Sequence, residues 1–166
     1  MNHIGVIMGS DSDYQVMEEA LEVLRQFEVS FEVIISSPQR TLKRTVDWVE
    51  GFEAQGGKLI IAAAGLAAHL PGVVAGATVL PVIGVPMNSG AMEGIDALYS
   101  IVQMPPGIPV ATVGIGAARN AAMLAIQILA SQEKALCIKV KDYRTRMLKD
   151  TEEKDEALQM RLCEAH

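Results

Sequence analysis

The sequence predicts an α/β fold, a three-layer sandwich in which a five-stranded parallel sheet lies between two layers of helices. Five short apolar runs of the kind found in buried strands alternate with segments whose apolar residues recur at helical spacing. Half of the residues are hydrophobic and only 4% are aromatic, as expected of Val-, Ile-, Leu- and Ala-rich parallel strands covered on both faces. With 166 residues, the chain is expected to form one domain.

The first part of the chain contains two strand–helix units and a third strand. Residues 3–8 (H-I-G-V-I-M), 31–35 (F-E-V-I-I) and 58–64 (K-L-I-I-A-A-A) are short runs of strand-forming type. Apolar residues at helical spacing predict helices at 14–27 and 40–55, the second of which stops at a Gly-Gly pair. Residues 65–76 are mostly small, so the backbone there can approach a ligand or a neighbouring element closely.

The second part continues the alternation and ends in a charged extension. Strands are expected at 79–85 and 109–115, and helices at 91–102 and 116–130, with M-P-P-G at 104–107 as a break. Residues 132–166 predict a long C-terminal helix that packs on a neighbouring subunit. The expected strand order is 2-1-3-4-5, as in flavodoxin. This order gathers the turns after the first three strands around one crevice at the carboxyl edge of the sheet.

Composition excludes several classes of partner. The net charge of −6 argues against nucleic acid as the main partner. No apolar run reaches the roughly 18 residues of a membrane span, and no secretory start is present. Cys137 and Cys163 lie far apart without metal-ligand spacing, which favours two reduced thiols. A cytoplasmic protein without a metal is therefore expected.

Polar side chains follow the first three predicted strands. Hydroxyl and carboxylate groups at Ser10 to Asp13 either only cap the next helix or, with backbone N–H groups, cradle a phosphate. Ser37 and Arg40 follow the second strand and suit a phosphorylated, sugar-bearing ligand. His69 follows the third strand, where it is either a packed, hydrogen-bonded residue or a catalytic group.

Four stretches of the sequence resemble the PurE family of purine biosynthesis. They are G-V-I-M-G-S-D-S-D at 5–13, A-A-H-L-P-G at 67–72, L-Y-S-I-V-Q-M-P-P-G-I-P-V at 98–110 and N-A-A-M-L-A-I-Q-I-L-A at 120–130. The resemblance covers roughly residues 4–131 in the family's order, and A-A-H-L-P-G resembles the N5-carboxyaminoimidazole ribonucleotide mutase branch. It implies a flavodoxin-like octamer with active sites near subunit interfaces. It also implies transfer of a carboxyl group from an exocyclic nitrogen to a ring carbon of aminoimidazole ribonucleotide, without metal or organic cofactor.

Matching the family motifs to this sequence implies a set of substrate-binding residues. Arg40 matches the arginine that holds the substrate, and the loop from Gly65 to His69 is expected to line the pocket for the base. The full set comprises Ser10, Ser12, Asp13, Ser37, Arg40, Gly65, Leu66, Ala67 and His69.

The sequence departs from the family pattern at the proton-carrying position. The family signature S-A-H-R-T corresponds here to residues 37–41, S-P-Q-R-T, so Gln39 stands at the histidine position. Ala63 and Leu66 replace glycines of the family's G-A-G-G and are expected to narrow the pocket. Three interpretations remain open: a mutase with poor turnover or reliance on His69, a paralogue acting on a related ribonucleotide, and a non-catalytic ribonucleotide-binding protein. A fourth is that residues 38 and 39 are only a tolerated loop change.

Overall fold

The computed structural model describes residues 4–164, so the first residue of the predicted strand at 3–8 lies outside the described part. The chain divides into two compact units, one up to Ile126 and one from Gln127 onward. The first unit contains the strands β1 (Ile4–Met8), β2 (Phe31–Ile35), β3 (Leu59–Ala64), β4 (Val82–Pro86) and β5 (Ala111–Thr112). The helices are η1 (Asp11–Asp13), α1 (Tyr14–Gln26), α2 (Pro38–Ala54), α3 (Leu70–Gly76), α4 (Ile95–Val102), α5 (Ala118–Ala130) and α6 (Lys134–Glu164).

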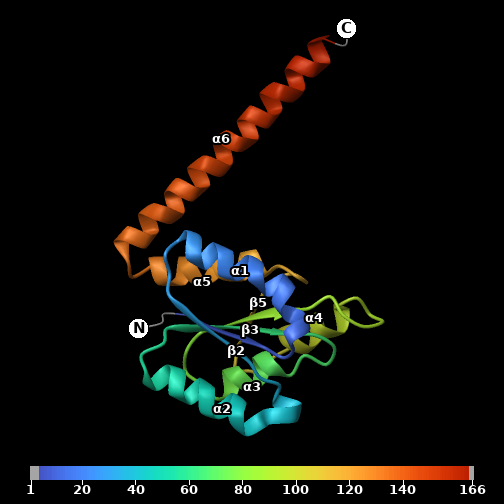
Figure 1. Cartoon of the computed structure of the whole chain (residues 1–166), viewed down its shortest axis with the longest axis vertical. Coiled ribbons are helices and arrows are strands. Elements are labelled where there is room, and N and C mark those ends of the chain that lie inside the picture. Colours follow the sequence, from blue (N-terminus) through green and yellow to red (C-terminus); the bar gives the residue numbers. More distant parts are fainter. Residues whose placement is uncertain (1–3, 165–166) are drawn as a thin grey trace. The chain divides into compact units, whose positions relative to one another are not determined.

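The five strands form one parallel sheet in the order β2-β1-β3-β4-β5 (Figure 1), which confirms the predicted fold and strand order. Met8, the last residue of β1, pairs with Ile35 at the end of β2 and with Ala63 in β3. Three strands therefore end almost level with one another. The turns that follow them leave the sheet at one edge, where the ligand crevice of an open α/β sheet is found.

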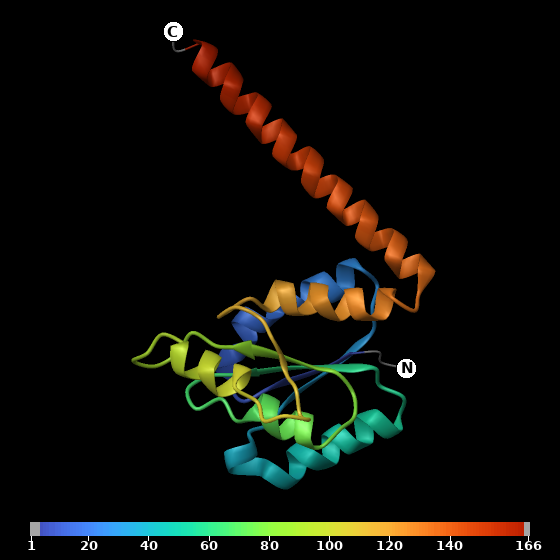
Figure 2. The ribbon, with the colours of Figure 1, turned by 180° about the vertical axis from the view of Figure 1, so that it is seen from behind.

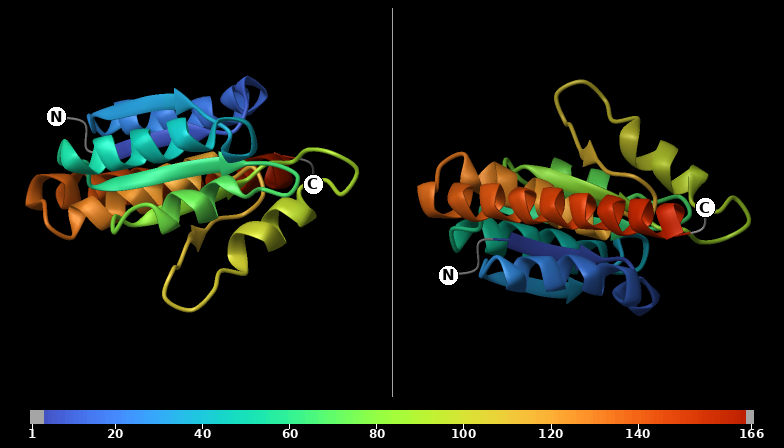
Figure 3. Two further views of the ribbon diagram at one scale, coloured as in Figure 1. Left: turned by 90° about the horizontal axis from the view of Figure 1, so that it is seen from below. Right: turned by 90° about the horizontal axis from the view of Figure 1, so that it is seen from above.

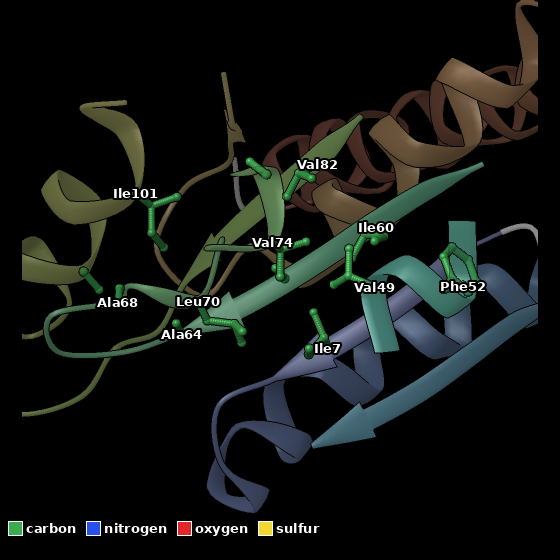
Figure 4. Close-up of a cluster of buried hydrophobic side chains, with 13 residues drawn as sticks. Ile7, Val49, Phe52, Ile60, Ala64, Ala68, Leu70, Val74, Val82 and Ile101 are labelled. Atoms are coloured by element: carbon green, nitrogen blue, oxygen red, sulfur yellow. The ribbon is translucent and has the colours of Figure 1, made fainter. Parts of the chain in front are cut away.

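Helices cover both faces of the sheet (Figures 1 and 2). α1 and residues 118–126 of α5 lie over one face, while α2 and α3 lie over the other, from which Figure 3 (left) views the sheet. On this second face, Val49 and Phe52 of α2, Val74 of α3 and Ile101 of α4 belong to one buried cluster with the strands (Figure 4). Alternate residues of β3, Ile60, Ala62 and Ala64, join this cluster, as the period of a strand requires.

Four predicted helix starts differ from the structure. α5 begins at Ala118 and not at residue 116, and α6 begins at Lys134 and not at residue 132. The other two differences have a clear local cause. α2 begins at Pro38 and not at residue 40, because proline has the backbone angle of a helix and its missing N–H costs nothing in the first turn. α4 begins at Ile95 and not at residue 91. Gly94 precedes it with φ of 88°, a left-handed conformation that is incompatible with a right-handed helix interior.

The strands and the small-residue segment also differ from prediction. β4 begins at Val82, and Val79, predicted to be in this strand, lies in a loop and is 89% exposed. β5 is limited to Ala111–Thr112 instead of spanning 109–115. Within the small-residue stretch, Leu70–Gly76 forms the short helix α3, with proline in its first turn.

The second unit includes α6, which confirms the predicted long C-terminal helix. Among residues 4–164, no helix combines the length and the apolar character that crossing a membrane requires.

Candidate active site

The turns after β1, β2 and β3 line a cleft of about 500 Å³ at the carboxyl edge of the sheet. All of the residues predicted for the site lie in this cleft, together with several that were not predicted. Its lining comprises Gly9, Ser10, Ser12, Asp13, Ser37, Pro38, Gln39, Arg40, Ala64, Gly65, Leu66, Ala67, Ala68, His69, Leu70 and Ser89.

The first turn is held by a capping box around η1. The Ser10 side chain accepts a hydrogen bond from the backbone N–H of Ser12, and the Asp13 carboxylate accepts one from the backbone N–H of Ser10. Ser12 Oγ also donates to Ser10 Oγ at 2.9 Å. The predicted capping role is therefore present, and the same side chains also face the cleft.

Asp13 is half-buried in the cleft wall. Desolvation by burial raises the pKa of this carboxyl group above its usual value, and the negative charge of Asp11 adds to the rise. The hydrogen bond from the Ser10 backbone acts in the opposite direction. When ionised, Asp13 offers acceptor oxygens only, which suits the hydroxyl groups of a sugar.

The second turn is held by a network of hydroxyl groups, of which those of Ser36 and Thr45 are buried. Ser36 Oγ lies 3.0 Å from Thr41 Oγ1 and 2.9 Å from Thr45 Oγ1. Thr41 Oγ1 donates to the Ser37 carbonyl and accepts from the Ser37 N–H, and Thr45 Oγ1 donates to the Thr41 carbonyl. Thr41 itself has non-helical angles (φ −141°, ψ 49°) and kinks α2 after its first turn. The kinked first turn carries Gln39 and Arg40 to the cleft.

Arg40 joins the second turn to the first. Its guanidinium donates to the Gly9 carbonyl at 3.0 Å, and the side chain lines the cleft near Ser10 and Ser12. Since a guanidinium has five N–H donors, most remain available for an anionic ligand. One end of the cleft thus contains the Arg40 guanidinium, the hydroxyl groups of Ser10 and Ser12 and the backbone of η1.

The third turn follows β3 and takes an unusual backbone path. Leu66 and Ala68 have positive φ angles of 55° and 40°, a region that L-residues rarely occupy. The turn also abuts the loop after β4, since a Cβ added at Gly65 would lie 2.2 Å from Ser89 Oγ. Sequence analysis missed Ser89, although a serine in a loop that follows a parallel strand is itself a signal for this edge of the sheet.

A hydrogen-bonded chain crosses from the second turn to the third. Ser37 Oγ donates to Gln39 Oε1 at 3.1 Å, and Gln39 Nε2 lies 3.0 Å from His69 Nδ1. Glutamine does not titrate near neutral pH, whereas histidine does. The structure thus places the one imidazole of the described chain beside the amide. Within residues 4–164, no group of three or more His, Cys, Asp or Glu side chains is placed to hold a metal ion.

Comparison with known proteins identifies the family of the chain. The family described as AIR carboxylase matches residues 3–150. The chain belongs to this family. The AIR carboxylase family includes N5-carboxyaminoimidazole ribonucleotide mutases similar to this chain. That of Pyrococcus abyssi is 54% identical over 147 residues, 89% of this chain and 84% of the relative. That of Thermotoga maritima is 48% identical over 159 residues, 96% and 93% of the two chains.

Solved structures of the AIR carboxylase family share the fold. The crystal structure of Treponema denticola PurE aligns with a TM-score of 0.82 and 30% identity, covering 93% of this chain and 97% of that one. A variant of PurE2 from the same organism aligns with a TM-score of 0.87 and 31% identity, covering 95% and 99%. The PurE resemblance and the flavodoxin-like sheet predicted from the sequence are thereby confirmed.

Proposed function

We propose that the protein is an N5-carboxyaminoimidazole ribonucleotide mutase of purine biosynthesis, acting as a single domain with residues 132–166 as a helical extension. It would move a carboxyl group from the exocyclic nitrogen to C4 of aminoimidazole ribonucleotide. The observation that carries the proposal is the cleft, where three turns bring hydroxyl groups, a carboxylate, a guanidinium and an imidazole together. Relatives about half identical to this chain and named as this mutase support it.

Each part of the ligand has a matching part of the cleft. Ser10, Ser12 and Arg40 bind the phosphate, because hydroxyl groups and a guanidinium donate to phosphate oxygens. Asp13 accepts hydrogen bonds from the ribose hydroxyl groups. The turn from Gly65 to His69 holds the aminoimidazole ring and its carboxyl group.

The reaction requires a group that protonates the nitrogen as the carboxyl group leaves and later removes a proton from the ring carbon. Gln39, at the position of the family's histidine, cannot do this, and loss of such a group typically slows a reaction by about 10²–10⁴. His69, hydrogen-bonded to Gln39, is the titratable group beside it. We therefore expect slow turnover that depends on His69.

A second candidate is a paralogue that binds a related ribonucleotide without turnover. The amide at Gln39 favours it, because the cleft retains its anion-binding groups and has lost a proton carrier. Measured turnover separates the two candidates.

The protein is further proposed to be a cytoplasmic homo-octamer. Large apolar side chains are exposed around the third turn and α4, including Leu66, Met92, Ile95, Tyr99 and Val102. Exposed apolar surface of this kind is typical of surfaces that associate. Sedimentation of the purified protein would give the size of the assembly.

Titration with aminoimidazole ribonucleotide, followed by a mutase assay, tests the function. Loss of charge-assisted hydrogen bonds in Arg40→Ala is expected to weaken binding by about 10–100-fold. Lys43→Ala is the matched control, since it removes the same charge from the same helix at a side chain that is 87% exposed and paired with Asp47. Absence of binding, or equal binding by both variants, would refute the assignment, whereas binding without turnover would favour the second candidate.

A further inference from the structure

The contacts of Gln39 define which nitrogen of His69 carries the proton. The amide oxygen of Gln39 accepts from Ser37 Oγ, so the amide nitrogen is the atom that lies 3.0 Å from His69 Nδ1. An amide nitrogen only donates, and Nδ1 must therefore accept. A neutral imidazole whose Nδ1 accepts carries its proton on Nε2.

Ser37 donates to the amide oxygen in this arrangement. Its side chain is buried, at 8% exposure, and a buried hydroxyl group needs a hydrogen-bond partner. The Gln39 oxygen provides it. On the other side of the ring, Nε2 of His69 has no partner within residues 4–164, and the side chain lines the cleft.

We propose that Gln39 is a positioning residue that holds His69 in the Nε2–H tautomer, so that the cleft offers a proton donor to the carboxyl group of its ligand. The identity of this ligand rests on the proposed function, whereas the tautomer rests on the hydrogen bonds alone. The consequence is selectivity: the cleft prefers the carboxylated ribonucleotide to aminoimidazole ribonucleotide without the carboxyl group. A lone pair on Nε2 would repel the same carboxylate.

The other ionisable groups of the cleft do not replace this donor. Arg40, from α2, donates to the Gly9 carbonyl of the first turn and, in the proposed function, directs its remaining donors to the phosphate, and Asp13, from η1, is an acceptor when ionised. In the third turn, the backbone N–H of Ala68 already donates to the Gly65 carbonyl. Among the side chains of the third turn, from Gly65 to His69, only the imidazole can donate a hydrogen bond, so His69 Nε2 is the side-chain donor that this turn offers to a carboxylate.

Nitrogen NMR of the full-length protein labelled with ¹⁵N-histidine tests the tautomer directly. The chain has three histidines, His3, His69 and His166, and His69→Asn identifies the signals of the central one. At about pH 8, where an ordinary histidine is neutral, the wild-type spectrum is expected to show a protonated Nε2 and an unprotonated Nδ1. A protonated Nδ1 in the wild type would overturn the proposal.

Two amide-to-carboxylate variants sharpen this experiment. Gln39→Glu places only acceptor oxygens beside Nδ1, so the proton is expected to move to Nδ1. Gln55→Glu makes the same chemical change at the exposed C-terminal end of α2, outside the cleft, and is expected to leave the His69 signals unchanged. Since Gln39 is exposed, neither change should unfold the protein. Unchanged His69 signals in Gln39→Glu would contradict the proposal.

Calorimetric titration tests the selectivity. Gln39→Leu releases the ring, and we expect affinity for 4-carboxyaminoimidazole ribonucleotide to fall about tenfold while affinity for aminoimidazole ribonucleotide changes less than about twofold. Equal losses for both ligands would overturn the selectivity. Failure of the wild type to bind either ligand would instead refute the proposed function, and the spectra would still decide the tautomer.

Discussion

Thr45→Val tests whether the hydroxyl groups beneath the second turn stabilise it. The substitution keeps the shape of a fully buried side chain and removes one hydroxyl group. Thr45 Oγ1 donates to the Thr41 carbonyl at 3.2 Å and lies 2.9 Å from Ser36 Oγ. Thr41 and Thr45 each donate their own hydroxyl proton to a carbonyl group, so the hydroxyl proton of Ser36 is shared between their two oxygens. In the variant, Ser36 can donate to Thr41 alone.

The expected loss is therefore one full hydrogen bond and part of another, about 1–2 kcal/mol of the free energy of unfolding. For a chain of this length, that corresponds to a fall in Tm of about 2–8 °C. Urea unfolding followed by circular dichroism measures the change in unfolding free energy. An unchanged dependence of this free energy on urea concentration would show that the unfolded state is unaffected.

Thr145→Val provides a matched control. Thr145 Oγ1 also donates to the carbonyl four residues earlier, that of Lys141, but it does so on an exposed face of α6. Water can replace this bond, so the change in stability is expected to stay within about 0.5 kcal/mol. Equal effects of the two substitutions would show that burial of the Ser36 and Thr45 hydroxyl groups contributes nothing.

Three further predictions address the core, pH and catalysis. A Cβ at Gly84 would lie 2.4 Å from Ile101 Cγ2 and 2.9 Å from Val110 Cγ1. Gly84→Ala is therefore expected to lower the free energy of unfolding by about 1–3 kcal/mol, measured by urea unfolding. Because burial raises the pKa of Asp13, the folded protein holds this proton more tightly than the unfolded chain, and the group costs stability as pH rises above its unfolded pKa. Asp13→Asn should therefore raise Tm at neutral pH but not in acid below that pKa, while weakening ribonucleotide binding; an unchanged Tm difference across pH would contradict this. Gln39→His is expected to raise the mutase rate by about 10²-fold, and an unchanged rate in the same assay would mean that neighbouring substitutions limit turnover.

The sheet and the contents of the cleft could be predicted from the sequence for a topological reason. Buried parallel strands are short apolar runs, and the order 2-1-3-4-5 brings the turns after β1, β2 and β3 to one edge. Residues as distant as Ser10, Ser37 and His69 consequently line one cleft. Their roles toward a ligand remain predictions that the binding experiments test.

The hydrogen bonds inside the cleft could not be predicted in this way. Gln39 and His69 are separated by 30 positions, and Gln39 lies in the first turn of α2 before the kink at Thr41, which the sequence pattern does not reveal. The start of α4 was missed for a related reason. Helical spacing of the apolar residues continues through Gly94, and only its φ of 88° shows where the helix begins.

Leu66 has a backbone conformation that the sequence does not reveal. It was expected to narrow the pocket because the resemblance to the family implies a glycine at this position. Its φ of 55° explains why glycine suits the position, since a left-handed conformation costs an L-residue about 1–2 kcal/mol. A Cβ at Gly90 would lie 2.5 Å from the Cδ2 atom of Leu66, so the leucine side chain approaches the loop after β4 at this glycine. Gly90 itself has φ of 73°, so glycine at position 90 both suits the backbone there and leaves room for the leucine, whose side chain stays 56% exposed.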